Sequence, residues 1–309
     1  GAARVPVLAV NLTAGSASGV TVNQLNFKKT GVISDSNISG AYLVQDGKVV
    51  AQYSSLSNGV ITFSNLGLSI AAGQTAKYWL SVDVSTGVAA GNTVGFSVNA
   101  ASDIVAVNAS NAAVTAGGTY PVMGNMFTAS TVSNPSLAGM TITSSTVGNT
   151  VFAGTTNVLV SQWSANVTSN PVKLSSVKFR VIGSANKSDL QNVKLFVNGT
   201  QVGSTLPVVA ASGDAYFDMT SAPATLRTGN SNIQIYADVM GSPSFNFSFQ
   251  LLNSYDVYAV DTQYNVPVAV TVNGGSGSSV TINQGQITVT ANSATPTGNL
   301  AKGSSGVTL

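Results

Sequence analysis

The amino-acid sequence predicts an all-β protein built from two tandem β-sandwiches. Apolar and polar residues alternate over runs of about five to eight residues, which is the pattern of half-buried strands. Gly, Asn, Asp and Pro separate these runs and supply turns. A block pattern also recurs after roughly 150 residues, as expected for a duplicated structural unit. The length of 309 residues is enough for two domains that each bury a core.

Composition argues against helices and against disorder. Only 7% of residues are charged, the sequence contains no Glu, and hydrophobic residues make up 44%. Polarity therefore comes mainly from Ser, Thr, Asn and Gly, which favour turns and strand surfaces over helix surfaces. Disordered chains lack the β-branched and aromatic residues that are frequent here.

The first unit is expected over residues 1–122. It opens with two apolar runs, residues 7–14 and 20–27, joined by a Gly/Ser turn. A hairpin follows over residues 38–47, where Asp-Gly supplies a turn that tolerates positive φ. Alternating runs at residues 78–84 and 103–107 complete the series.

The second unit is expected over residues 124–283, with residues 124–156 as a linking strand segment. It repeats the blocks of the first in the same order, at residues 158–165, 172–179, 190–199, 233–239 and 256–260. This match places Trp163 at the position of Leu12, in the core, and turns Trp79 outward. The expected core of the first unit is Leu8, Leu25, Phe27, Leu43, Leu80 and Val82, and that of the second is Leu159, Val177, Phe179, Phe196, Ile235 and Ala237.

Residues 284–309 are predicted to begin a third unit. Residues 285–289 match residues 124–128, and residues 307–309 fall where residues 150–152 lie. Residues 1–8 have the character of the strand that should follow. Either the polypeptide continues as a longer tandem array, or the C-terminal segment of one copy pairs with the N-terminal sandwich of the next.

The residue types present argue against an enzyme. Without His, Cys or Glu, the chain cannot form Ser–His–Asp, Cys–His or paired-Glu machinery. Ser175 and Lys178 have the spacing of a Ser–Lys dyad, but on a strand residues three apart point to opposite faces. Basic residues are too scattered for nucleic acid, and no apolar run reaches the roughly 18 residues of a membrane span.

No cofactor is expected, with calcium as the alternative because Asp oxygens are its usual ligands. Asp35 with Asn37, and Asp214 with Asp218, come nearest to a cluster; turn chemistry accounts for both pairs. Asp83 and Asp238 recur at equivalent positions and are expected to be solvated.

Sequons for N-glycosylation, a modification of secreted proteins, stand at Asn11, Asn37, Asn108, Asn166, Asn186, Asn198 and Asn246.

The repeated pattern V-x-V-L-x-V-x-L-T-A, a Gly/Ser turn, V-T-V-x-x-L-x-F and a later D-G hairpin resembles tandem immunoglobulin-like modules. Such modules occur in prokaryotic surface-layer proteins and large adhesins. The resemblance implies two immunoglobulin-like sandwiches in an extracellular, cell-surface protein that assembles. It carries over no individual functional residue.

These observations predict a structural subunit of a prokaryotic surface layer or extracellular filament whose partners are copies of itself, arranged head to tail. The expected C-terminal donor is Val307, Thr308 and Leu309, and the expected N-terminal acceptor is Val5, Val7 and Leu8. Strand addition of this kind uses main-chain hydrogen bonds and does not close on itself. An adhesin stalk or binding module, or a non-catalytic domain of a larger secreted protein, is the alternative.

Overall fold

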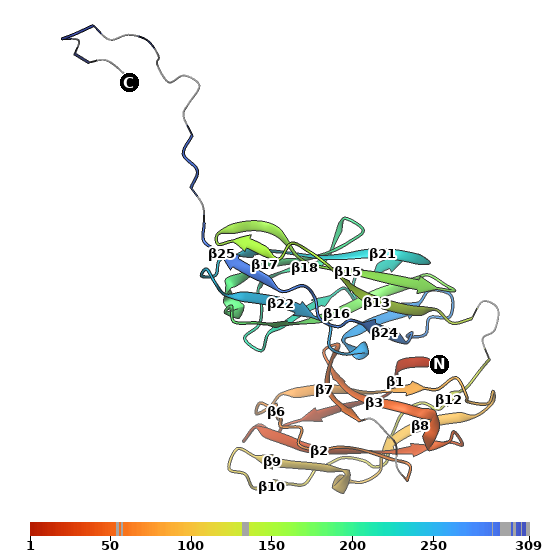
Figure 1. Cartoon of the computed structure of the whole chain (residues 1–309). Coiled ribbons are helices and arrows are strands. Elements are labelled where there is room, and N and C mark those ends of the chain that lie inside the picture. The colour runs from red at the N-terminus through yellow and green to blue at the C-terminus, as the bar shows by residue number, and fades with distance from the viewer. Residues whose placement is uncertain are drawn as a thin grey trace.

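The computed structural model describes residues 1–309 apart from 54–55, 57, 132–135, 286, 291–297, 299–300, 304 and 307–309. The described residues form strands and four single-turn 3₁₀ helices, η1 (Asp35–Asn37), η2 (Ala101–Asp103), η3 (Lys187–Asp189) and η4 (Ser254–Asp256). The prediction of an all-β chain of immunoglobulin-like sandwiches is confirmed. Figure 1 shows two layered β units stacked along the chain, with the N-terminus near the plane between them.

The first sandwich consists of strands β1 to β12. Their bounds are β1 (Ala2–Thr13), β2 (Val20–Thr30), β3 (Ile38–Gln45), β4 (Lys48–Tyr53), β5 (Val60–Phe63), β6 (Leu68–Ile70), β7 (Thr75–Val84), β8 (Thr93–Val98), β9 (Ile104–Asn108), β10 (Ala113–Val114), β11 (Val122–Met123) and β12 (Phe127–Thr128). One sheet has the order β1-β7-β3-β4. The other has the order β10-β9-β2-β8-β11, with β5 and β6 on β2 and β12 on β8.

The second sandwich consists of strands β13 to β25. Their bounds are β13 (Gly139–Ser145), β14 (Thr150–Phe152), β15 (Thr155–Thr168), β16 (Val172–Ile182), β17 (Leu190–Val197), β18 (Thr200–Val208), β19 (Asp214–Asp218), β20 (Ala224–Leu226), β21 (Gly229–Val239), β22 (Asn246–Gln250), β23 (Val257–Asp261), β24 (Val270–Asn273) and β25 (Val280–Asn283). Its sheets have the orders β18-β17-β21-β15-β13-β24 and β14-β25-β22-β16-β19, with β20 and β23 on β16.

Each sandwich encloses its own hydrophobic core, and most of the expected core residues lie there. All six expected residues of the first core are at most 3% exposed, as are Val177, Phe179, Ile235 and Ala237 in the second. Leu159 is only half-buried, because a bulge between Leu159 and Ser161 turns Val160 into the core instead.

The expectation for Phe196 was wrong. Leu195, which pairs with Ile235 on β21, is the residue that faces the second core. Phe196 lies on the opposite face of β17 and packs edge-on against Tyr236, with ring centroids 5.1 Å apart. The matched blocks, residues 38–47 and 190–199, align Leu43 with Leu195. Naming Phe196 instead shifted the counterpart by one residue, which reverses the face because side chains alternate along a strand.

The two sandwiches correspond with an offset that differs from the sequence match in β1. Arg4 and Asn157 both have positive φ, 54° and 51°. Each lies in the first bulge of its strand, β1 or β15, and these two bulges are equivalent. This offset puts Trp163, which is fully buried, at the place of Val10 rather than Leu12. The error of two residues left the predicted face unchanged.

At the far end of each unit the same correction applies. Gly124 and Gly277 are equivalent, because each donates its N–H to the carbonyl of a core Phe, Phe96 or Phe249. Strand β12 is therefore the counterpart of β25. The sequence match of residues 285–289 with residues 124–128 was wrong.

Backbone contacts join the sandwiches directly. Ala2 at the start of β1 forms an isolated antiparallel bridge with Val268, and the Ala3 N–H donates to the Pro267 carbonyl at 3.2 Å. The N-terminal end of β1 is therefore covered by the second sandwich. Among the described residues, no helix is long and apolar enough to cross a membrane.

Candidate assembly site

Strand β1 has three stretches with different neighbours on its outer edge. The second sandwich bridges Ala2, and Gly124 approaches the middle, where an added Cβ would lie 2.3 Å from the Val7 carbonyl oxygen. Among the strands that the structure describes, none pairs with the outer edge of residues 9–13. This stretch leaves backbone groups unpaired at a sheet edge.

The second sandwich closes the equivalent edge with two additional strands. There β13 runs antiparallel to β15, pairing Thr143 with Ser164 and Gly139 with Thr168. Strand β24 then runs parallel to β13, starting at the pair of Met140 and Val270. In the described part of the first sandwich, neither addition has a counterpart beside β1.

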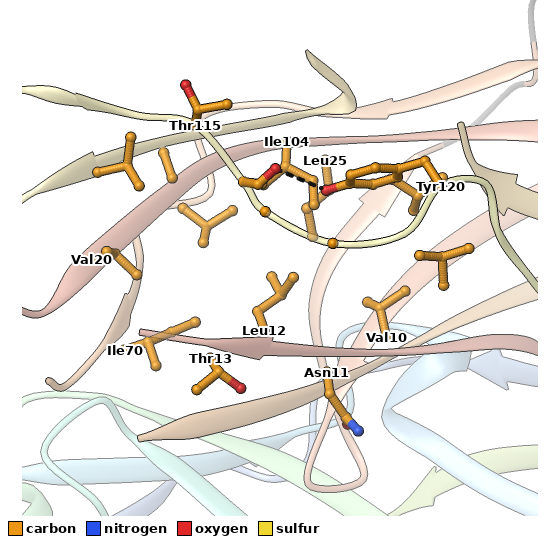
Figure 2. A pocket seen from close by; sticks show the side chains of 18 of the residues that line it. Val10, Asn11, Leu12, Thr13, Val20, Leu25, Ile70, Ile104, Thr115 and Tyr120 are labelled. Carbon is orange, nitrogen blue, oxygen red and sulfur yellow. Dashed lines mark hydrogen bonds between the residues drawn. The ribbon is translucent and has the colours of Figure 1, made fainter. Parts of the chain in front are cut away.

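A cavity of about 520 Å³ opens beside this unpaired stretch, between the two sheets of the first sandwich. Figure 2 shows Val10 and Leu12 of β1 pointing into the cavity, whereas Asn11 and Thr13 point away. The side chains that line it are mostly aliphatic and none is charged, and they include Val20, Val22, Leu25, Ile70, Ile104 and Ala106. The space is therefore suited to apolar groups.

In the second sandwich the side chains of β13 occupy the corresponding space. Met140 and Ile142 are 2% and 1% exposed and belong to the second core. Trp163 also contributes bulk there that Val10 does not supply in the first sandwich. An edge strand with two inward apolar residues, together with the larger Trp163, thus distinguishes the filled core from the open one.

The outer wall of the cavity is the segment of residues 115–120. Along the chain this segment follows β10, which pairs with β9, and precedes Gly124. It therefore holds the chain position that β24 holds in the second sandwich. The Tyr120 hydroxyl donates to the Ala116 carbonyl at 3.3 Å, so the segment folds on itself (Figure 2). In the second sandwich β13 fills this slot. In the first sandwich the slot is open, with β1 on one side and residues 115–120 on the opposite side.

Two aspartates that the sequence singled out have a structural role at the bulge of each sandwich. The Asp83 carboxylate accepts the Arg4 N–H at 2.7 Å, and that of Asp238 accepts the Asn157 N–H at 2.7 Å. A hydrogen bond from Asn192, together with that from Asn157, lowers the pKa of Asp238. Both aspartates lie on the face opposite the core, as expected, and each also holds a positive-φ residue in place at the start of a long strand.

The residues predicted as the acceptor lie on the covered part of β1. Val7 and Leu8 are buried in the first core, and Val5 is half-buried opposite Val82. The predicted donor residues Val307, Thr308 and Leu309 lie outside the described residues. The open stretch of residues 9–13 was not singled out, because its lack of a partner becomes visible only when the strand pairings of the two sandwiches are compared.

The geometry around Ser175 and Lys178 is structural. Ser175 is buried at a bulge of β16, where its carbonyl accepts the Met219 N–H. The Lys178 ammonium instead forms an ion pair with Asp256 at 2.8 Å.

The aspartates of the two clusters considered for calcium bind protein groups. Asp35 pairs with Lys29 at 2.6 Å, and the hydrogen bond from Lys29 is the main reason why the pKa of Asp35 is lowered. Asp214 pairs with Arg180, and Asp218 accepts the N–H and hydroxyl of Thr220. Nowhere in the described part of the chain do three His, Cys, Asp or Glu side chains gather in a way that could hold a metal ion.

The sequons differ in accessibility. Asn11, Asn166, Asn186, Asn198 and Asn246 are exposed, whereas Asn37 and Asn108 are half-buried. The Asn108 side-chain oxygen accepts two turn N–H groups, from Ser110 and Ala112, so this residue serves its own loop.

Comparison with known proteins gives no family. No family model matches the chain, and no curated protein matches it. Among solved structures, a type I cohesin of ScaB from Pseudobacteroides cellulosolvens is 10% identical, covering 50% of this chain and 97% of its own, with a TM-score of 0.29. The C-terminal domain of the antigen I/II-family protein AspA from Streptococcus pyogenes is 10% identical, covering 91% and 94%, with a TM-score of 0.20. That of the antigen I/II polypeptide BspA from Streptococcus agalactiae is 11% identical, covering 91% and 95%, with a TM-score of 0.21.

Proposed function

We propose that this chain is a structural subunit of a prokaryotic surface layer or extracellular filament, and that copies assemble head to tail through β-strand contacts. One observation carries the proposal: among the described strands, a sandwich with an unpaired edge and an open apolar cavity is followed in the same chain by a sandwich whose equivalent edge is closed. An unpaired edge beside an open core favours the addition of a strand. A contact between different surfaces of two copies propagates without closing.

The surface chemistry supports dense packing between copies. Charged residues make up 7% of the chain, so few charges would have to be desolvated at contacts. The absence of Cys and the Ser-, Thr- and Asn-rich composition suit an extracellular protein. The proposed role is non-catalytic and places the protein at the cell surface.

Assembly can be tested with the full chain. Sedimentation velocity over a range of protein concentrations, with electron microscopy of the same samples and of native material, should show linear or sheet-like polymers. Only monomers in both preparations would contradict the proposal.

An adhesin stalk or binding module is the second candidate. The direct contacts between the two sandwiches, from Ala2 to Val268 and from Ala3 to Pro267, would suit a stiff rod. Monodisperse rods that bind a glycan or a host protein would support this role instead.

A further inference from the structure

We propose that residues 287–290 of one copy are the strand that fills the open slot of the first sandwich in the next copy. This assignment rests on the proposed head-to-tail assembly and names its two contacting elements. The acceptor is the slot between residues 9–13 of β1 and residues 115–120. The donor is the segment that directly follows β25.

The donor has the sequence of the strand that fills the equivalent slot. Residues 287–290 read Ile-Thr-Val-Thr, and residues 140–143 of β13 read Met-Thr-Ile-Thr. The apolar residues in both are two apart, so they share one face of a strand while the threonines take the other. Ile287 and Val289 therefore correspond to Met140 and Ile142, the residues that complete the second core.

The exposure of these two pairs is opposite. Ile287 and Val289 are 91% and 86% exposed, the highest values among the large hydrophobic residues of the described chain. Ile287 and Val289, which correspond to the inward positions of an edge strand, are thus exposed to water. The cavity of the first sandwich lacks such a strand among the described residues, so burial of these two side chains in that cavity would fill it.

The position of the donor favours a second copy as its partner. In Figure 1 the described residues that directly follow β25 extend from the second sandwich on the side away from the first sandwich. Four Cα steps separate Asn283 from Ile287 and span at most about 14 Å. A linker this short requires the first sandwich of the next copy to stand directly against the end of the second sandwich, which produces a head-to-tail array.

The pairing of β13 with β15 gives the register. Thr143 pairs with Ser164, and Thr141 pairs with Asn166. The offset that relates Arg4 to Asn157 also relates Asn11 to Ser164 and Thr13 to Asn166. Thr290 of one copy should therefore lie opposite Asn11 of the next copy, and Thr288 should lie opposite Thr13. Residues 115–120 would then flank the donor on its other side, as β24 flanks β13.

Substitutions on the two faces of the donor provide a matched test. Val289→Asp should abolish polymers at concentrations where the natural chain is fully assembled, whereas Thr290→Asp, on the outward face, should leave assembly within about twofold. Both variants should keep the melting temperature of the unassembled chain, since the segment is exposed. Normal polymers from Val289→Asp would overturn the assignment while leaving head-to-tail assembly intact. Failure of the natural chain itself to polymerise would contradict both proposals.

Truncation separates this donor from residues 307–309. A chain ending at residue 291 should still polymerise, and one ending at residue 284 should not. Loss of assembly in the longer truncation would move the donor toward the C-terminal end and overturn the assignment.

Because the chain has no Cys, engineered pairs can report the register. Asn11→Cys with Thr290→Cys should give a ladder of disulfide-linked oligomers after oxidation, at least tenfold more than Asn11→Cys with Thr288→Cys, which is two residues out of register. Equal ladders, or a disulfide formed only within monomers, would overturn the assignment. The assignment would also be overturned if, in native material, residues upstream in the same polypeptide occupied the slot.

Discussion

The guanidinium carbon of Arg4 lies 4.7 Å from the ring centroid of Tyr258, although the two residues belong to different sandwiches. The Arg4 side chain also donates to the carbonyl oxygens of Tyr255 and Val257, the latter at 3.3 Å. Arg4 itself is 7% exposed. A buried cation that is bound by carbonyls and an aromatic face on the neighbouring unit fixes how the two sandwiches stack.

Arg4→Ala should therefore loosen the junction between the sandwiches. The loss of charge-assisted hydrogen bonds and a desolvated cation–π contact should cost about 2–4 kcal/mol of unfolding free energy. Hydrogen exchange should rise at residues 255–268, and small-angle scattering should show a broader distribution of lengths. Lys77→Ala is a suitable control, because its cation–π partner Trp79 is 38% exposed and lies within the same sandwich. Unchanged exchange in Arg4→Ala would show that other contacts set the junction.

Truncation of a central aromatic residue should destabilise each sandwich separately. Phe27 and Phe179 are 0% and 1% exposed, so Phe27→Ala and Phe179→Ala should each cost roughly 3–5 kcal/mol in denaturant titration. Phe196→Ala should cost clearly less, because Phe196 is half-buried on the opposite face of its sheet. Equal costs for all three would mean that the core assignment is wrong.

Asp261 should make the second sandwich sensitive to acid. Burial would raise the pKa of this carboxyl, but hydrogen bonds from Asn170 and from the N–H groups of Tyr264, Ala138 and Gln263 outweigh it and hold the pKa below its usual value. A lowered folded pKa contributes stability that is complete above the unfolded value of about 3.9 and is lost as the pH falls through it toward the folded value.

Asp261→Asn should accordingly lower the unfolding free energy at pH 7 by about 2–4 kcal/mol, since an NH2 group replaces one carboxylate oxygen and the two N–H groups bound to that oxygen lose their acceptor. The variant should also show a weaker loss of stability between about pH 5 and pH 2 than the natural chain. Thermal unfolding across this range measures both effects. An unaltered pH profile would show that other carboxyls dominate acid unfolding.

A peptide of residues 285–292 should act as a chain terminator. By occupying the slot beside residues 9–13, it should shorten polymers in proportion to its concentration, as measured by sedimentation. The same peptide with Asp in place of Ile287 and Val289 should have no effect. If both peptides act equally, the inhibition does not depend on apolar side chains entering the cavity.

The strand pattern and the internal repeat predicted much of this architecture from sequence. Alternation at residues 20–27 and 172–179 placed Phe27 and Phe179 correctly because a strand's period of two fixes which side chains face the core. The match in β1 was two residues out of register, yet Trp163 was still predicted to be buried, since a shift of two preserves the face. The bulge between Leu159 and Ser161 that turns Val160 inward could not be read this way, because it becomes visible only in the pairing of β15 with β21.

The sequence predicted only part of the candidate site. The repeat predicted its general nature, a donor strand near the C-terminal end of the chain and an acceptor near the N-terminal end. Its location does not, because a missing edge strand is defined by the pairings of β13, β15 and β24. The Met-Thr-Ile-Thr and Ile-Thr-Val-Thr segments are the signal that could have located the donor, once residues 140–143 were known to form an edge strand.

The measurement that tests the central claim most directly is a high-resolution electron microscopy map of the assembled polymer. It should show residues 287–290 of one subunit between β1 and residues 115–120 of the next, with Ile287 and Val289 in the cavity beneath Leu12. Polymers in which this slot is empty, or is filled by any other segment, would contradict the account.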